Sequence, residues 1–127
     1  MKHKIFLIED NDQNRYMVTF LLEKHGYEVE SAMDGPSGIE LASRVLPSLI
    51  LLDIQLPRMD GYAVARELRR NPVLANTPVV AVTSYAMPGD REKTIAAGCN
   101  GYIEKPINPD TFVAEIERYL NGAPRVN

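Results

Sequence analysis

Three apolar runs of four residues constrain the fold of this chain more than any other feature. They are Ile5–Ile8, Leu49–Leu52 and Val79–Val82, and none contains a polar residue. A strand with one face in water alternates apolar and polar residues, whereas a strand covered on both faces is apolar throughout. The runs therefore predict three central strands of a sheet that has helices on both faces.

Two further segments have the character of edge strands. Tyr27–Glu30 alternates in polarity, and Gly101–Glu104 is short and mixed. Longer amphipathic stretches separate all five segments, which is the βαβα pattern of a parallel sheet. Right-handed crossovers, with these two segments at the edges, leave 2-1-3-4-5 as the simplest strand order. We therefore expect an α/β protein of the flavodoxin-like, doubly wound (βα)5 class, with a five-stranded parallel sheet in that order.

Five helices are predicted between and after these strands. Asn11 or Asp12 is the expected cap of the first helix, and Gly26 lies where a left-handed residue often ends a helix. Pro36 suits the first position of the second helix. The expected ranges, in chain order, are about 13–25, 35–46, 61–71, 90–98 and 110–122.

Length, charge and cysteine content narrow the functional classes. The 127 residues suit one domain. A net charge of −3 argues against nucleic-acid binding by the chain as a whole. No apolar run exceeds four residues, so we expect no membrane span. The single cysteine, Cys99, favours a reducing compartment and a role as apolar filler. A cytoplasmic protein is the simplest expectation.

Polar residues follow the strands at the edge of the sheet where their carboxyl ends meet. Glu9 and Asp10 follow the first strand, Asp53 follows the third, Thr83 the fourth and Lys105 the fifth. In open parallel sheets, ligands bind outside these ends where the strand order reverses, which is here between the first and third strands. We therefore expect three carboxylates, a hydroxyl and an ammonium group in one cleft.

Three carboxylates in one cleft need a cation. A close like-charge pair costs about 4 kcal/mol at ~4 Å and an effective dielectric constant of about 20. Lys105 offsets one charge, and Mg²⁺ is the natural further cation because the set contains no His or Cys. A magnesium ion held by two or three protein oxygens keeps positions for phosphate, so the cleft predicts phosphoryl chemistry.

Asp53 is the expected phosphoryl acceptor among the three acids. It stands alone at the end of a central strand, and carboxylates form acyl phosphates. Glu9 and Asp10 are interpreted as a paired metal clamp. Thr83 would donate a hydrogen bond to the phosphoryl group and Lys105 would neutralise one of its oxygens, as phosphoryl transfer requires.

Four motifs together resemble the receiver domain of two-component response regulators. In order they are ED at 9–10, LLDIQLPRMDG at 51–61, VTS at 82–84 and YIEKP at 102–106. The likeness extends from Lys4 to about Leu120 and is greatest to stand-alone regulators and to the receivers of hybrid kinases. It implies one receiver domain over residues 1–122, a short tail at 123–127, and no output domain.

The resemblance also implies a role for each acidic residue. Asp53 would accept phosphate from a phosphohistidine on a histidine kinase or a histidine phosphotransfer protein. Asp10, Asp53 and the backbone carbonyl of Gln55 would bind Mg²⁺ directly, while Glu9 would act mainly through water.

A conformational switch is the second implication of the resemblance. Thr83 would move toward the phosphoryl group and the Tyr102 ring would turn inward, while Lys105 would pair with the phosphate next to a cis Lys105-Pro106 bond. A downstream protein would bind the face built by the fourth helix, fifth strand and fifth helix. Such a protein is a switch and not an enzyme, apart from its own phosphorylation and slow autodephosphorylation.

Other interpretations stay open. Taken singly, Asp10 could belong to a helix cap, and Thr83, Tyr102 and Lys105 could be ordinary strand or surface residues. The chain could be a receiver-shaped interaction module that is not phosphorylated, an aspartyl-nucleophile phosphatase or a flavodoxin-like cofactor carrier. The phosphatase would need an Asp-x-Asp pair after the first strand. The carrier would need a phosphate-cradling loop where the acidic segment 9–12 stands.

Two residues are expected to flank the path of a water that attacks the acyl phosphate. Gln55 lies two residues after Asp53, and Tyr85 lies two residues after Thr83. We predict that Tyr85 partly shields the acyl phosphate and lengthens its lifetime, so that Tyr85→Ala speeds dephosphorylation.

Overall fold

The protein is built on a five-stranded parallel sheet, seen here in a computed structural model that describes residues 3–84 and 88–121. The strand order is β2-β1-β3-β4-β5. The strands are β1 (Lys4–Ile8), β2 (Glu28–Ala32), β3 (Leu49–Asp53), β4 (Val79–Thr83) and β5 (Gly101–Glu104). The predicted flavodoxin-like fold class, with the second and fifth strands at the edges, is confirmed.

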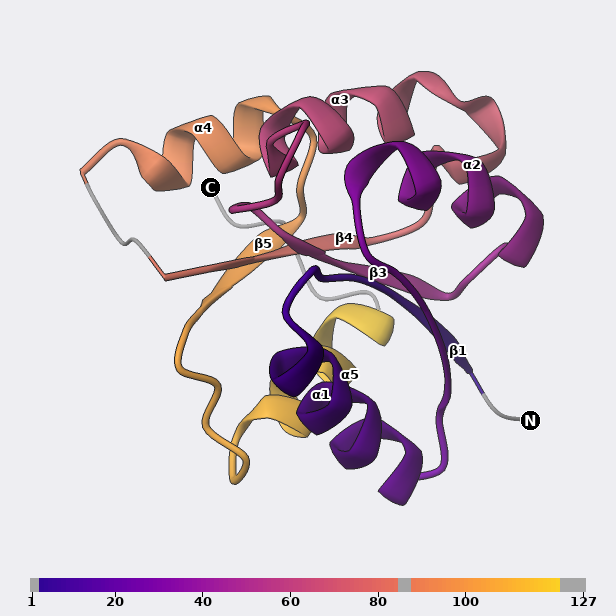
Figure 1. Ribbon diagram of the computed structural model, residues 1–127, viewed down its shortest axis with the longest axis vertical. Coiled ribbons are helices and arrows are strands. Elements are labelled where there is room, and N and C mark those ends of the chain that lie inside the picture. Colours follow the sequence, from indigo (N-terminus) through magenta and orange to yellow (C-terminus); the bar gives the residue numbers. More distant parts are fainter. Residues whose placement is uncertain (1–2, 85–87, 122–127) are drawn as a thin grey trace.

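Helices cover both faces of the sheet (Figure 1). The face at the bottom of the view carries two helices, α1 (Asp12–Lys24) and α5 (Phe112–Leu120). The upper face carries three helices, α2 (Gly35–Val45), α3 (Gly61–Arg70) and α4 (Asp90–Ala96). A 3₁₀ turn, Pro72–Leu74, follows α3.

The central strands are buried on both faces, as their composition predicts. In β1, Ile5 and Leu7 belong to the core cluster under α1 and α5, whereas Phe6 and Ile8 belong to the cluster under α2 and α3. Every residue of β3 and β4 is buried. Burying one such aliphatic side chain stabilises the fold by roughly 1.5–3 kcal/mol. Burial on both faces therefore fixes the strand ends from which the polar side chains emerge.

Side-chain caps begin three of the helices. Asn11, Asp34 and Asp60 each accept a hydrogen bond from the backbone N–H three residues further on, at the starts of α1, α2 and α3. After α1, Gly26 has a φ of 93°, the left-handed conformation expected at a helix end.

Some predicted boundaries are wrong by one or more residues. The helix α5 begins at Phe112, because a turn in which Asn108 accepts the amides of Asp110 and Thr111 precedes it. The helix α4 ends at Ala96 instead of residue 98. The strand β2 begins one residue later than predicted and continues to the buried Ala32. These local turns and continuations leave the strand order unchanged.

Arg69 connects the segments at the amino end of the sheet. Its Nε donates to the carbonyl of Gly98 at 2.7 Å, and its Nη1 donates to those of Leu74 at 3.0 Å and Thr77 at 2.7 Å. Its Nη2 donates to Asn100 Oδ1 at 2.7 Å. One guanidinium therefore joins α3 to the segments that lead into β4 and β5. This set of contacts is the Arg69 network.

Cys99 lies beside this network and is 3% exposed. Burial raises the pKa of its thiol to about 12. The prediction that Cys99 fills the core is confirmed. Within residues 3–84 and 88–121, no helix is long and apolar enough to cross a membrane.

Candidate functional site

Three carboxylates meet at the carboxyl ends of β1 and β3. Glu9 and Asp10 follow β1 directly, and Asp53 is the last residue of β3. One oxygen from each of the three side chains lies within 4.8 Å of the others. Glu9 and Asp53 are 3% and 2% exposed, whereas Asp10 is exposed. The predicted convergence of these acids is confirmed, and this group of three is the acidic cluster.

Lys105 brings a positive charge to the acidic cluster from the far side of β4. Its Nζ lies 3.1 Å from Glu9 Oε1 and 3.4 Å from Asp53 Oδ2. Its backbone N–H donates to the carbonyl of Thr83 at 2.8 Å, which holds the segment after β5 against the end of β4. The Lys105-Pro106 peptide bond is cis, as the family resemblance implies. One ammonium group thus contacts two of the three carboxylates.

The electrostatic imbalance is visible at Glu9. Burial raises the pKa of Glu9, and its hydrogen bond with Asp53 and the charge of Asp53 raise it further. The amide of Asn11, which donates to Glu9 Oε2 at 3.2 Å, and the charge of Lys105 both lower the pKa, but the net direction is upward. Lys105 therefore offsets only part of the repulsion between the acids.

Gln55 closes the site between β3 and β4. Its backbone N–H donates to Asp53 Oδ1 at 3.0 Å, which orients the carboxylate. Its side-chain Oε1 accepts from the N–H of Ser84 at 3.3 Å. Its Nε2 is buried and, within the described part of the chain, has no hydrogen-bond partner. A buried donor without a partner is costly, so this amide group is available to a further acceptor in the site.

The segment after Asp53 is fixed from behind by Gly61. The N–H of Gly61 donates to the carbonyl of Ile54 at 2.9 Å. A Cβ at Gly61 would lie 2.4 Å from Ile54 Cα and 2.7 Å from the carbonyl oxygen of Asp53, so only glycine fits this approach. The start of α3 thus holds the backbone next to Asp53 in place.

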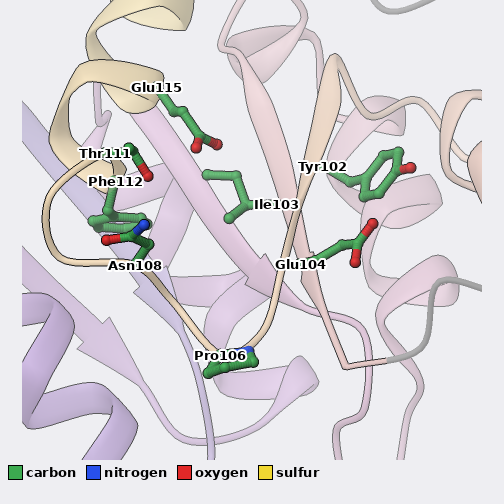
Figure 2. A pocket seen from close by; sticks show the side chains of 8 residues that line it. All are labelled: Tyr102, Ile103, Glu104, Pro106, Asn108, Thr111, Phe112 and Glu115. Atoms are coloured by element: carbon green, nitrogen blue, oxygen red, sulfur yellow. The ribbon is translucent and has the colours of Figure 1, made fainter.

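Thr83 and Tyr102, the two residues expected to form a switch, lie on neighbouring strands. Thr83 ends β4 and is 5% exposed. Figure 2 shows Tyr102 and Ile103 projecting to opposite sides of β5. Tyr102 is partly buried and packs against the core cluster under α2 and α3. Tyr85, which was expected to shield the site, lies outside the described residues.

Sequence reasoning missed two contributions to this site. Arg15 donates from Nη1 to the backbone carbonyl of Glu9 at 3.0 Å and so ties α1 to the acidic segment. Gln55 was expected to bind Mg²⁺ through its backbone carbonyl and to flank the path of an attacking water, but the contact of its side chain with Ser84, which links β3 to β4, was not expected. A basic residue one turn into the first helix was the available signal for Arg15, whereas no local pattern marks the Gln55 side chain.

The acidic cluster fits a hard divalent cation. Its side-chain donors are all carboxylate oxygens, the ligands that Mg²⁺ prefers, and neither His nor Cys is among them. The uncompensated charge and the raised pKa of Glu9 indicate that a cation would relieve repulsion there. Asp10 is exposed, which leaves the cluster open to solvent on one side.

The fold and the acidic cluster define a known class of signalling domain. The sequence matches the response regulator receiver domain over residues 5–117, and the chain therefore belongs to that family. A curated relative is the polar-differentiation response regulator DivK of Brucella anthropi. DivK is 39% identical over 123 residues, and the match covers 97% of this chain and 100% of DivK.

Solved structures agree with this assignment. The chemotaxis protein CheY4 of Vibrio cholerae superposes with a TM-score of 0.89 at 29% identity, over 93% of this chain and 98% of CheY4. The receiver domain of the sensor histidine kinase PA1611 from Pseudomonas aeruginosa gives a TM-score of 0.88 at 33% identity, over 96% of this chain and 100% of that domain. The PA1611 structure holds a magnesium ion coordinated in its active-site cleft.

Membership of this family sets the general function. Receiver domains are phosphorylation-regulated switches of two-component signalling and not classical enzymes, and they interact with histidine kinases or phosphotransfer proteins and with downstream targets. They bind Mg²⁺ at an acidic pocket, and Glu9, Asp10 and Asp53 form such a pocket here.

Proposed function

We propose that this protein is a phosphorelay switch in which Asp53 accepts a phosphoryl group from a phosphohistidine. One observation carries the proposal. The buried Asp53 carboxylate is oriented by the N–H of Gln55 and lies 3.4 Å from the Lys105 ammonium, in a cluster of acids that calls for a cation. A carboxylate in this setting is both a nucleophile and a metal ligand.

In the transfer step, an Asp53 carboxylate oxygen attacks the phosphorus atom of the phosphohistidine. The new O–P bond forms as the P–N bond breaks, and the imidazole leaves with the electron pair of that bond. Lys105 then pairs with a phosphoryl oxygen in place of its present contact with the Asp53 carboxylate. Thr83, at the neighbouring strand end, donates its hydroxyl hydrogen bond to another. Slow hydrolysis of the acyl phosphate by water returns the Asp53 carboxylate.

The carboxylates of Asp10 and Asp53 and the backbone carbonyl of Gln55 are the proposed direct ligands of Mg²⁺, and Glu9 acts through water. When bound, the ion neutralises the negative charge that the acids and the phosphoryl group share. The open side of the cluster at Asp10 supports this assignment.

Phosphorylation changes a population of conformations, and Thr83 and Tyr102 carry the change. The surface that responds is formed by α4, β5 and α5, and it binds a downstream protein. A pocket of ≈360 Å³ between β5 and α5 supports this choice of face (Figure 2). We expect no direct contact with nucleic acid or membrane, and a cytoplasmic location. We assign the domain to residues 1–122 and expect residues 123–127 to be dispensable for phosphorylation.

Intact-mass measurement after treatment with acetyl phosphate and Mg²⁺ tests this function. We expect the mass of one phosphoryl group to appear on the wild-type chain and to be absent from Asp53→Asn. Asp110→Asn is the matched control, because Asp110 is exposed before α5, and it should be phosphorylated normally. A phosphorylated Asp53→Asn protein would disprove the acceptor assignment, and an unmodified wild type would favour the interaction module. Steady turnover of a foreign phosphate ester would favour the phosphatase.

A further inference from the structure

A cleft between α3 and α4 lies apart from the acidic cluster and from the pocket between β5 and α5. It has a volume of ≈260 Å³. Its lining comes from the first part of α3 and the last part of α4, and consists of Asp60, Tyr62, Arg66, Lys93, Ala96 and Ala97. The two helices lie along the same face of the sheet in Figure 1. None of the roles assigned above uses this cleft.

Among the residues that the structure describes, the two cationic side chains of the cleft have no acidic partner. Arg66 and Lys93 are exposed, and within residues 3–84 and 88–121 neither side chain makes an ion pair or a hydrogen bond. The other arginines of α3 are engaged, Arg69 in its network and Arg70 with Glu67 at 3.1 Å. The single carboxylate of the lining, Asp60, already accepts from the N–H of Ala63 at 2.9 Å as the cap of α3. The lining therefore carries two positive charges and one negative charge, and neither positive side chain forms an ion pair with Asp60 in the described part of the chain.

Apart from Asp60 and the two cations, the lining consists of Tyr62, Ala96 and Ala97. Ala96 is exposed, Ala97 is 3% exposed, and the half-buried ring of Tyr62 forms part of the wall. Small-molecule sites usually enclose about 300–1,000 Å³, so this cleft is below the size that surrounds a cofactor. It has room for an apolar side chain from a larger molecule. Protein interfaces have an apolar centre and a polar rim, and Arg and Tyr are enriched in them.

We propose that the α3–α4 cleft docks an acidic segment of a protein partner. One apolar side chain of that segment packs on Tyr62, Ala96 and Ala97, and flanking carboxylates pair with Arg66 and Lys93. Charge complementarity favours an acidic segment. A basic segment would be repelled by Arg66 and Lys93, and a neutral segment would leave both side chains without an ion-pair partner. The proposal does not depend on phosphorylation of Asp53.

Selection from three displayed peptide libraries tests the proposal on the unphosphorylated full chain. Each library combines apolar residues with one polar class: Asp and Glu, Asn and Gln, or Lys and Arg. We expect the acidic library to give binders whose affinity falls at least tenfold in Arg66→Glu and in Lys93→Glu. Arg44→Glu on α2 is the matched charge control and should bind normally. Arg66→Gln and Lys93→Gln should give smaller losses in the same direction.

The apolar half of the cleft has its own test. Ala96→Leu keeps every charge and occupies the space for the anchor, so it should also weaken the acidic binders at least tenfold. All these positions are exposed on helices, and circular dichroism verifies that the variants fold. The proposal fails if no acidic peptide depends on Arg66 and Lys93, if Ala96→Leu binds like wild type, or if the neutral or basic library gives the cleft-dependent binders. Displacement of the binders by citrate at equal concentration would also overturn it, because the cleft would then be a small-anion site.

Discussion

The two ends of the sheet each hold a partly buried cation, and the two cations have opposite surroundings. At the amino end, Arg69 donates to neutral groups, namely backbone carbonyls and the Asn100 side chain, and its closest contacts are 2.7 Å. At the carboxyl end, Lys105 lies between the charged side chains of Glu9 and Asp53, at 3.1 and 3.4 Å. The first cation completes a hydrogen-bond network, whereas the second carries one positive charge beside an acidic cluster of three carboxyl groups, Asp10 included.

The amino end of the sheet therefore contributes to stability, whereas the carboxyl end is arranged to bind a ligand. The carbonyls around Arg69 need donors, and the guanidinium provides them, so nothing further is required at that end. The acids around Lys105 repel one another, and the buried Nε2 of Gln55 has no acceptor among the described residues. The unbalanced charge and the unpaired donor at this site would be satisfied by a bound ligand. Until a ligand binds, they lower the free energy of unfolding of the protein.

Replacement of Arg69 should have the largest effect on stability. Arg69→Met leaves the carbonyls of Gly98, Leu74 and Thr77 without their donor, and we expect a loss of about 3 kcal/mol in the free energy of unfolding. Urea denaturation measures it. Arg70→Met is the control, because Arg70 is exposed and pairs only with Glu67, and it should cost less than about 0.5 kcal/mol. Equal effects of the two substitutions would contradict the importance of the Arg69 network.

Magnesium should have the next largest effect, and it should act at the opposite end. At about 100 times its Kd, Mg²⁺ should raise the free energy of unfolding by about 2.7 kcal/mol. The increase should vanish in Asp10→Asn and Asp53→Asn and persist in Asp110→Asn. An increase that survives Asp53→Asn would show that the ion binds elsewhere.

Alkaline pH should lower the free energy of unfolding because the buried thiol of Cys99, at the amino end of the sheet, ionises more easily in the unfolded chain. The folded state raises the pKa of this thiol from 9.0 to about 12, so its contribution to stability is complete below pH 9 and is lost as the pH rises toward 12. Between pH 9 and 10 the loss approaches about 1 kcal/mol in the wild type. In Cys99→Ala, the free energy of unfolding should decline less steeply with rising pH than in the wild type, because all other groups titrate equally in both proteins. Denaturation at several pH values measures this decline. Parallel declines would mean that the thiol is not buried as described.

The sequence predicts the fold well because strands that are buried on both faces of the sheet must consist of consecutive apolar residues. Ile5–Ile8, Leu49–Leu52 and Val79–Val82 are apolar for that reason, and all three are central strands. The start of α5 was not predictable from the helix signals, because the side chain and carbonyl of Asn108 first close a turn. Such competition between local hydrogen bonds is decided in three dimensions.

The acidic cluster was predictable for a topological reason, and the Arg69 network was not. Residues that follow parallel strands must meet at one edge, so the positions of Glu9, Asp53 and Lys105 follow from strand order alone. Arg69 lies on a helix beside another arginine, and its sequence neighbours give no sign that it turns inward. Two of its partners, Gly98 and Asn100, lie 29 and 31 residues further along the chain. Only the folded chain identifies them.

The Asp53→Asn variant tests whether the acidic cluster is destabilising by itself. Asp53→Asn removes a buried negative charge beside Glu9 and Asp10, keeps an oxygen that accepts from the N–H of Gln55, and gives up one contact with Lys105. Because repulsion exceeds the lost attraction when three acids face one cation, the variant should be more stable than wild type by about 1 kcal/mol in EDTA. The pKa of Glu9 should also fall, since Asp53 helps to raise it. Urea denaturation and NMR titration measure the two changes. A less stable variant with an unchanged Glu9 would mean that Lys105 already balances the site, and the contrast between the two ends of the sheet would then be wrong.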